Sequence, residues 1–125
     1  MRILIDTHIY LWWLQDNPKL SAVAREKIMS ATEVYVSSAS LWEASIKIGI
    51  GKLDADINVL VEQIALNGFL ELPVRAVHAM RSCHLPEHHR DPFDRMLVAQ
   101  AMCEPLRLLT ADAQVARYSE LVDLV

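Results

Sequence analysis

Short β-branched or leucine-rich runs alternate along this chain with longer segments in which apolar residues recur at helical spacing. The short runs have the length and the residue types of buried strands. They predict five strands, over residues 2–6, 34–37, 69–72, 107–110 and 121–125.

The longer segments predict helices, several of which begin at recognisable capping residues. Ser21 precedes the second helix, and Ser38 or Ser40 caps the third. Asp91-Pro92 begins the sixth, with aspartate at the N-cap and proline at the first helical position. The helices are predicted over residues 7–15, from 22, from the serine cap to about 50, 56–66, 74–83, from 91–92 and 112–118.

Strands that alternate with helices predict an α/β fold with right-handed crossovers. The sheet is expected to be mainly parallel and covered by helices on both faces. A chain of 125 residues is expected to form one domain, residues 1–125, that buries roughly two-thirds of the surface of its unfolded state.

Composition narrows the class of protein. No apolar run reaches the roughly 18 residues of a membrane span, so a membrane partner is not expected. No basic segment with a cleavage site precedes the first strand, and two cysteines are too few for a disulfide framework, so the reducing cytoplasm is the expected location. The net charge of −4 counts against a passive nucleic-acid binder, but it suits an enzyme whose metal site concentrates negative charge.

Acidic and hydroxyl side chains occur where the predicted strands end. Asp6 closes the first strand, Ser37 closes the second, and Thr110 closes the strand that leads into Asp112. Because ligands of open α/β sheets bind beyond the carboxyl ends of the strands, these groups are expected to meet at one edge. Asp6 and Asp112 can equally be caps of the helices that follow them, and both interpretations remain open.

Further carboxylates lie in largely apolar helical segments. Glu43, in SLWEASIKIGI, either pairs with Lys47 at i+4 or reaches a buried site. Asp94, in DPFDRMLVAQAM, shares a face with the apolar residues at i+3, i+4 and i+7, so it needs a cation or donors there. Asp91, one turn earlier, is either an N-cap or a further ligand. Several carboxylates at one edge predict a magnesium site, because Mg²⁺ prefers oxygen ligands.

The polar stretch 84–90 (HLPEHHR) is expected to be an exposed loop. It contains His84, His88 and His89 and follows Cys83. This spacing matches no standard structural zinc site closely, so a polar loop is the preferred interpretation.

Four motifs follow one another along the chain: LIDTH, SLWEASIKIGIGKL, HHRDPFDRMLVAQA and LLTADAQV. In this order and at this spacing, they resemble the PIN domain, and more narrowly the VapC-like ribonuclease toxins of prokaryotic type II toxin–antitoxin pairs. The resemblance covers essentially the whole chain and implies a three-layer α/β/α PIN-like fold. It also implies an endoribonuclease that depends on Mg²⁺ or Mn²⁺, a homodimer, and a cognate antitoxin that inserts a peptide segment into the catalytic groove.

The resemblance assigns the four catalytic, metal-holding acids of the family to residues of this chain. None of the four is replaced, and Asp91 is a further candidate metal ligand beside the third. The small hydroxyl residues that accompany these acids map to Thr7 and Thr110. The four acids are Asp6, Glu43, Asp94 and Asp112, and the first and third are the preferred direct or water-bridged ligands.

Basic residues near the acid-bearing segments have two open interpretations. Arg95, Arg90, Lys47 and Lys52 either contact RNA phosphates or are surface charges and ion-pair partners.

Two other classes of protein compete with the nuclease. A haloacid-dehalogenase-like phosphatase would use Asp6 as a nucleophile, but its motif carries a second aspartate two residues later, where this chain has His8. A PIN-like module that only binds RNA or a protein is the non-enzymatic alternative, and the intact acids argue against it.

Overall fold

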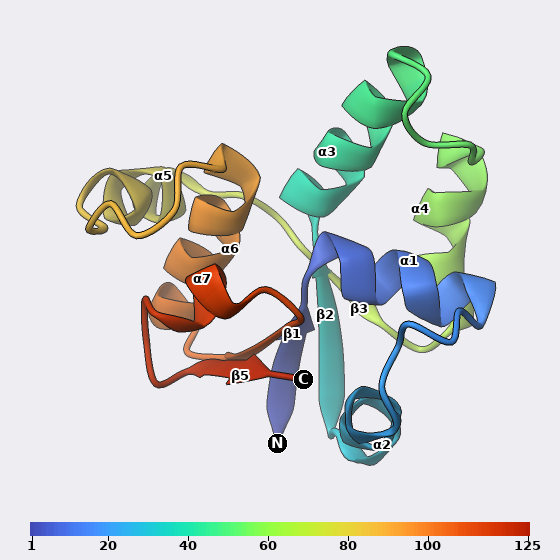
Figure 1. Cartoon of the computed structure of the whole chain (residues 1–125), viewed down its shortest axis with the longest axis horizontal. Helices are drawn as coiled ribbons and strands as arrows, with labels where there is room; N and C mark the ends of the chain where they lie inside the picture. The colour runs from blue at the N-terminus through green and yellow to red at the C-terminus, as the bar shows by residue number, and fades with distance from the viewer.

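The computed structural model describes residues 1–125. Its strands are β1 (Arg2–Ile5), β2 (Glu33–Ser37), β3 (Leu70–Leu72), β4 (Arg107–Thr110) and β5 (Val122–Leu124). They form one sheet in the order β3-β2-β1-β4-β5, with every neighbouring pair parallel (Figure 1). The expectation of a mainly parallel sheet is therefore confirmed, and β1 lies at its centre.

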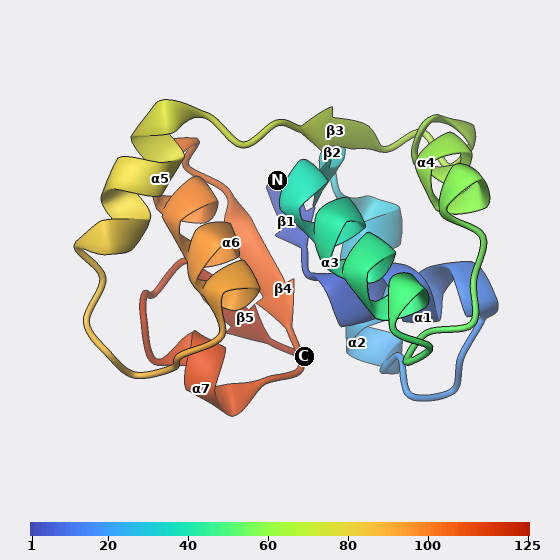
Figure 2. The same cartoon turned by 90° about the horizontal axis from the view of Figure 1, so that it is seen from above.

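Helices cover both faces of this sheet, as Figure 2 shows by viewing the molecule from above. One face carries α1 (Thr7–Gln15), α2 (Ala22–Ser30) and α4 (Ile57–Leu66), and the other carries α5 (Ala76–Cys83), α6 (Pro92–Cys103) and α7 (Ala113–Ala116). The alternation of side chains along β1 supplies both cores. Ile3 and Ile5 belong to the core with α1 and α2, and Leu4 to the core with α6, each fully buried.

The remaining helix, α3 (Ser38–Gly49), follows β2 directly and lies at the carboxyl ends of the strands (Figure 1). It contacts α1, α4 and α6, so it bridges the two helical layers. Its N-cap is Ser37, whose hydroxyl accepts a hydrogen bond from the Ala39 amide, and not Ser38 or Ser40 as the sequence predicted. The other two serines are engaged elsewhere: the Ser38 hydroxyl accepts from the Val74 amide, and Ser40 lies beside Thr7.

Two other predicted helices are longer than the observed ones by two residues or more. The fifth begins at Ala76 and not at residue 74, because Arg75 has extended backbone angles and its amide donates to His78 Nδ1. The seventh covers Ala113–Ala116 and not 112–118, since Asp112 is its N-cap. The longest helices have twelve residues, and none of the seven has the length and apolarity needed to traverse a bilayer.

Candidate metal centre

The strand order brings the ends of β1 and β4 together. The chain proceeds from β1 outward through β2 to β3, and then returns to the opposite side of β1 to form β4. The two strands therefore flank the point where the connections reverse direction, which is where open α/β sheets bind ligands. Asp6 follows β1, and Thr110 and Asp112 lie at the end of β4.

Asp6 is the most deeply buried of the acids that follow a strand, with 5% of its surface exposed. Its Oδ1 accepts a 2.8 Å hydrogen bond from the Ile9 amide, so the capping role is real. Burial raises the pKa of Asp6, an effect that hydrogen bonds from Thr110 and Ile9 oppose and the negative charge of Glu43 reinforces. A cap alone does not require a carboxylate this far from water, because serine or asparagine caps equally well.

Glu43 reaches the same edge from α3 and is 4% exposed. Its Oε1 accepts a 2.7 Å hydrogen bond from the Thr7 hydroxyl, and its Oε2 lies 2.8 Å from Lys47 Nζ. The i, i+4 pair therefore forms, but it joins a buried carboxylate and is not a pair on an exposed face. Thr7, itself buried, fixes one oxygen of Glu43 beside Asp6.

Asp94 points from the first turn of α6 toward the other acids. Burial raises its pKa to about 6; the hydrogen bond with His89 opposes this rise, and the charges of Asp91, Asp6 and Glu43 add to it. Asp91 is the N-cap of α6, and its Oδ1 accepts from the amides of Phe93 and Asp94. The alternative that Asp91 is a cap is therefore realised, while the partly buried carboxylate of Asp94 faces the other acids.

Asp112 completes the set at the N-terminus of α7. Its Oδ1 accepts from the Gln114 amide at 2.8 Å, and its own amide donates to Thr110 Oγ1 at 3.1 Å. Capping uses only this one oxygen of Asp112. The other, Oδ2, lies 3.7 Å from His89 Nε2.

His89 is the one member of the cluster that sequence reasoning assigned to an exposed loop. Its Nε2 lies 2.9 Å from Asp94 Oδ2, and ligand atoms of His89, Asp94 and Asp112 lie within 4.8 Å of one another. The stretch between α5 and α6 does lack helix and strand, but it folds over the acids instead of away from them. The only signal in the sequence is the closeness of His89 to Asp91 and Asp94 along the chain.

Arg95 holds this loop in place. Its guanidinium donates to the Tyr118 hydroxyl and to the backbone carbonyls of Ser82, Leu85 and Pro86. Of the basic residues near the acids, Lys47 thus pairs with Glu43 and Arg95 binds backbone, while Arg90 and Lys52 are exposed.

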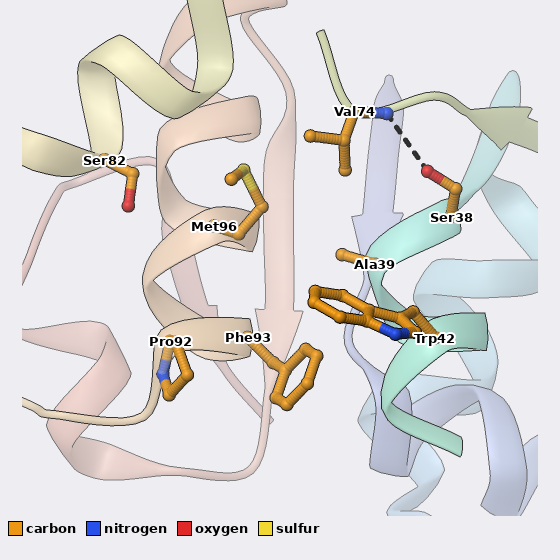
Figure 3. Close-up of a pocket in the computed structure, with 8 residues that line it drawn as sticks. All are labelled: Ser38, Ala39, Trp42, Val74, Ser82, Pro92, Phe93 and Met96. Atoms are coloured by element: carbon orange, nitrogen blue, oxygen red, sulfur yellow. Dashed lines mark hydrogen bonds between the residues drawn. The ribbon is translucent and has the colours of Figure 1, made fainter. Parts of the chain in front are cut away.

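An apolar cavity of about 430 Å³ lies between α3 and α6. Trp42 and Phe93 meet edge to face across it, with ring centroids 5.4 Å apart, and Met96 and Val74 line its wall (Figure 3). Each aromatic residue immediately precedes an acid of the cluster, Glu43 or Asp94. Apolar surface, including a Trp42 that is 65% exposed, therefore adjoins the acidic site.

The donor set fits a hard divalent cation. Four carboxylates converge at one edge. Burial raises the pKa of two of them, Asp6 and Asp94, and the negative charge of neighbouring acids adds to both shifts, so an added positive charge relieves repulsion. Carboxylate oxygens are the ligands that Mg²⁺ and Mn²⁺ take in proteins. Asp6 and Glu43 are buried, and Asp112 Oδ2 lies 3.7 Å from the same imidazole nitrogen that contacts Asp94.

A model of the PIN domain family matches residues 3–121. The chain belongs to the PIN domain family, and the fold class that the four sequence motifs imply is confirmed.

Within that family, the expected likeness to VapC proteins is confirmed. The chain is 28% identical over 116 residues to ribonuclease VapC22 of Mycobacterium tuberculosis (strain ATCC 25618 / H37Rv), covering 90% of this chain and 88% of that protein. Its fold is similar to VapBC2 from Rickettsia felis, solved with a DNA fragment from their promoter (TM-score 0.70, 16% identity, 98% of each chain). It is also similar to a toxin–antitoxin complex from Klebsiella pneumoniae (TM-score 0.69, 18% identity, 97% of this chain and 95% of that one).

Proposed function

We propose that this protein is an endoribonuclease that depends on Mg²⁺ or Mn²⁺ and acts as the toxin of a toxin–antitoxin pair. The observation that carries the proposal is the convergence of four carboxylates at the switch point of a PIN-family sheet. The similarity to a protein named ribonuclease VapC22 supports RNA as the substrate. The four acids are Asp6, Glu43, Asp94 and Asp112.

The chain contributes ligands and fixed hydrogen bonds. Asp6 and Asp94 would hold the cation, and the Thr110 hydroxyl would orient Asp6 through the hydrogen bond between them. Thr7 and Lys47 fix the two oxygens of Glu43, so that this carboxylate can orient water or a second ion without turning away. Bound there, a divalent ion lowers the pKa of water and offsets negative charge on the scissile phosphate.

Hydrolysis at such a site uses water and not the 2′-hydroxyl of the RNA. The cut ends are therefore expected to carry a 5′-phosphate and a 3′-hydroxyl. Products that end in a 2′,3′-cyclic phosphate would contradict this mechanism.

The activity is tested by incubating the antitoxin-free protein with total RNA and with transfer RNA, in Mg²⁺, in Mn²⁺ and in EDTA. Metal-dependent cleavage is expected for the wild type and is expected to be lost in Asp6→Asn. Asp54→Asn is the matched control, since it removes an exposed carboxylate outside the cluster. Absence of cleavage with every metal and RNA, combined with retained RNA binding, would favour the non-catalytic binding module.

The proposed protein partner is a cognate antitoxin, and the proposed assembly includes a homodimer. The solved structures with similar folds include complexes described as toxin–antitoxin pairs, which supports such a partner. The exposed Trp42 and its cavity offer apolar surface beside the acids, of the kind that protein partners cover. The proposed location is the cytoplasm, where the free thiols of Cys83 and Cys103 stay reduced.

A further inference from the structure

His89 lies beside the acids because the loop that carries it folds over the acidic edge. The segment between α5 and α6 passes beside α7 just before α6 begins (Figure 2). From there Nε2 of His89 lies 2.9 Å from Asp94 Oδ2 and 3.7 Å from Asp112 Oδ2. Three separate segments of the chain therefore bring a nitrogen and two carboxylate oxygens within 4.8 Å of one another.

The backbone of His89 is fixed by contacts that no other residue of the loop has. Its amide donates to the Tyr118 hydroxyl at 2.8 Å, and its carbonyl accepts from the same hydroxyl at 2.8 Å. Arg95 binds that hydroxyl too, at 3.1 Å, together with carbonyls earlier in the loop. These hydrogen bonds hold the loop in place and thereby position the imidazole beside the acids. A metal ligand needs such support from neighbouring groups to keep its orientation.

We propose that His89 is a cation ligand of this site, with Nε2 binding the same divalent ion as Asp94 and Asp112. The inference rests on the proposed function, which it extends by one nitrogen ligand. A neutral imidazole has one nitrogen with a free lone pair, and the spacing of the three groups lets that nitrogen exchange its contact with Asp94 for a contact with the ion.

A nitrogen ligand changes which ion the site prefers. Mg²⁺ is hard and takes oxygen ligands almost exclusively, whereas first-row transition ions accept imidazole readily. The site with His89 is therefore expected to favour Mn²⁺ over Mg²⁺ more strongly than the four carboxylates alone would.

The decisive measurement is electron spin-echo spectroscopy of Mn²⁺ bound to the full chain, together with calorimetric titration of Mn²⁺ and of Mg²⁺. The wild type is expected to show a coupling from a directly bound ¹⁴N nucleus, replaced by a ¹⁵N coupling when histidine is isotopically labelled. His89→Gln is expected to lose the coupling and to bind Mn²⁺ at least about tenfold more weakly. Its affinity for Mg²⁺ is expected to fall by a smaller factor.

Two neighbouring histidines provide matched controls. His88→Gln changes the adjacent loop residue, whose ring packs against Tyr118, and His8→Gln changes an exposed histidine near Asp6. Both variants are expected to keep the nitrogen coupling and the affinity for Mn²⁺. The labelling experiment needs no substitution, so the test holds even if His89→Gln folds poorly.

The outcomes separate this inference from the proposed function. Mn²⁺ bound to the wild type without nitrogen coupling, or with equal affinity in His89→Gln, overturns the role of His89 and leaves the carboxylate site standing. Failure of Mn²⁺ alone to bind the wild type overturns the role of His89, and failure of both Mn²⁺ and Mg²⁺ to bind overturns the proposed function as well. Coupling that disappears in His8→Gln and persists in His89→Gln would show that the bound nitrogen belongs to His8, and this also overturns the inference.

Discussion

At the scale of single residues, the carboxylate of Asp94 opposes folding of the metal-free protein. Its pKa is raised to about 6, by burial first, while in the unfolded chain it titrates near 3.8. The folded state therefore favours the neutral carboxyl of Asp94. The stability that this neutral carboxyl allows is fully present below pH 3.8 and is lost as the pH rises through about 6. Above that pH the ionised group is disfavoured by on the order of 3 kcal/mol.

Asp94→Asn is accordingly expected to unfold at a higher temperature than the wild type at pH 7.5 in EDTA. The difference should shrink steadily as the pH is lowered toward 4, because the wild-type carboxyl becomes neutral in the folded state. Thermal unfolding followed by circular dichroism at several pH values measures both effects. If the melting temperature of Asp94→Asn is not higher at pH 7.5, or is higher by the same amount at all pH values, the ionised carboxylate of Asp94 does not destabilise the fold.

The hydroxyl of Thr7 makes a second residue-scale prediction. Thr7→Val keeps the shape of the side chain but leaves the buried Oε1 of Glu43 without its donor, and it is expected to lower the free energy of unfolding by about 1–3 kcal/mol. Thr7→Ser keeps the hydroxyl and is expected to lose less. Urea unfolding of the two variants decides the matter, and a Thr7→Val variant as stable as the wild type would mean that the hydrogen bond contributes nothing.

His89 marks the limit of what residue types along the chain can tell. Asp6, Glu43, Asp94 and Asp112 could be selected because each interrupts an apolar run or follows a strand. A histidine in a polar loop carries no such pattern. The position of His89 depends on hydrogen bonds between its backbone and the hydroxyl of Tyr118, a residue far away in sequence.

At the scale of elements, local capping signals predicted most helices closely, and tertiary contacts account for the errors. Ser21 and Asp91 cap the helices assigned to them, because their side chains can bond only to the amides that follow. In the run Ser37 to Ser40, any serine satisfies the local pattern. Ser37 is selected because Ser38 binds the Val74 amide and Ser40 packs against Thr7, which no short stretch of sequence reveals.

The two interpretations of Asp91 can be separated by substitution. Asp91→Ala is expected to lower the free energy of unfolding by about 1 kcal/mol, because the amides of Phe93 and Asp94 lose their acceptor. Asp91→Asn keeps the cap, and both its stability and its affinity for Mn²⁺ are expected to stay close to those of the wild type. A clear loss of Mn²⁺ affinity in Asp91→Asn, measured by calorimetry, would make this residue a ligand as well as a cap.

At the scale of the whole molecule, the alternation of strands and helices was enough to predict a parallel sheet covered on both faces. The order of strands was not predictable in the same way, since it depends on which edges pair after the chain returns from β3. That return places β4 beside β1 and brings Asp6 and Asp112 to one edge of the sheet, the edge that the general behaviour of strand ends indicates for a ligand. The sequence did not indicate that His89 would lie at the same edge.

Cation binding is expected to stabilise the whole fold. An ion that binds only the folded state adds about 2.7 kcal/mol at a concentration one hundred times its dissociation constant. The melting temperature of the wild type should therefore rise with Mg²⁺ or Mn²⁺ in the millimolar range, and that of Asp6→Asn should respond much less. A melting temperature of the wild type that ignores both ions would contradict a preformed site.

The pairing of β1 with β4 also has a consequence in time. Ile3 lies opposite Arg107, so the two halves of the proposed site are made about a hundred residues apart. At a synthesis rate of ~5–20 residues per second, Asp6 leaves the ribosome many seconds before Asp112 exists. During that interval, and in any chain that stalls or is degraded before β4, Asp6 lacks the acid that follows β4, and the site that we propose is incomplete. Unfinished copies of the nuclease that we propose are therefore expected to lack the complete acid cluster and, with it, the activity.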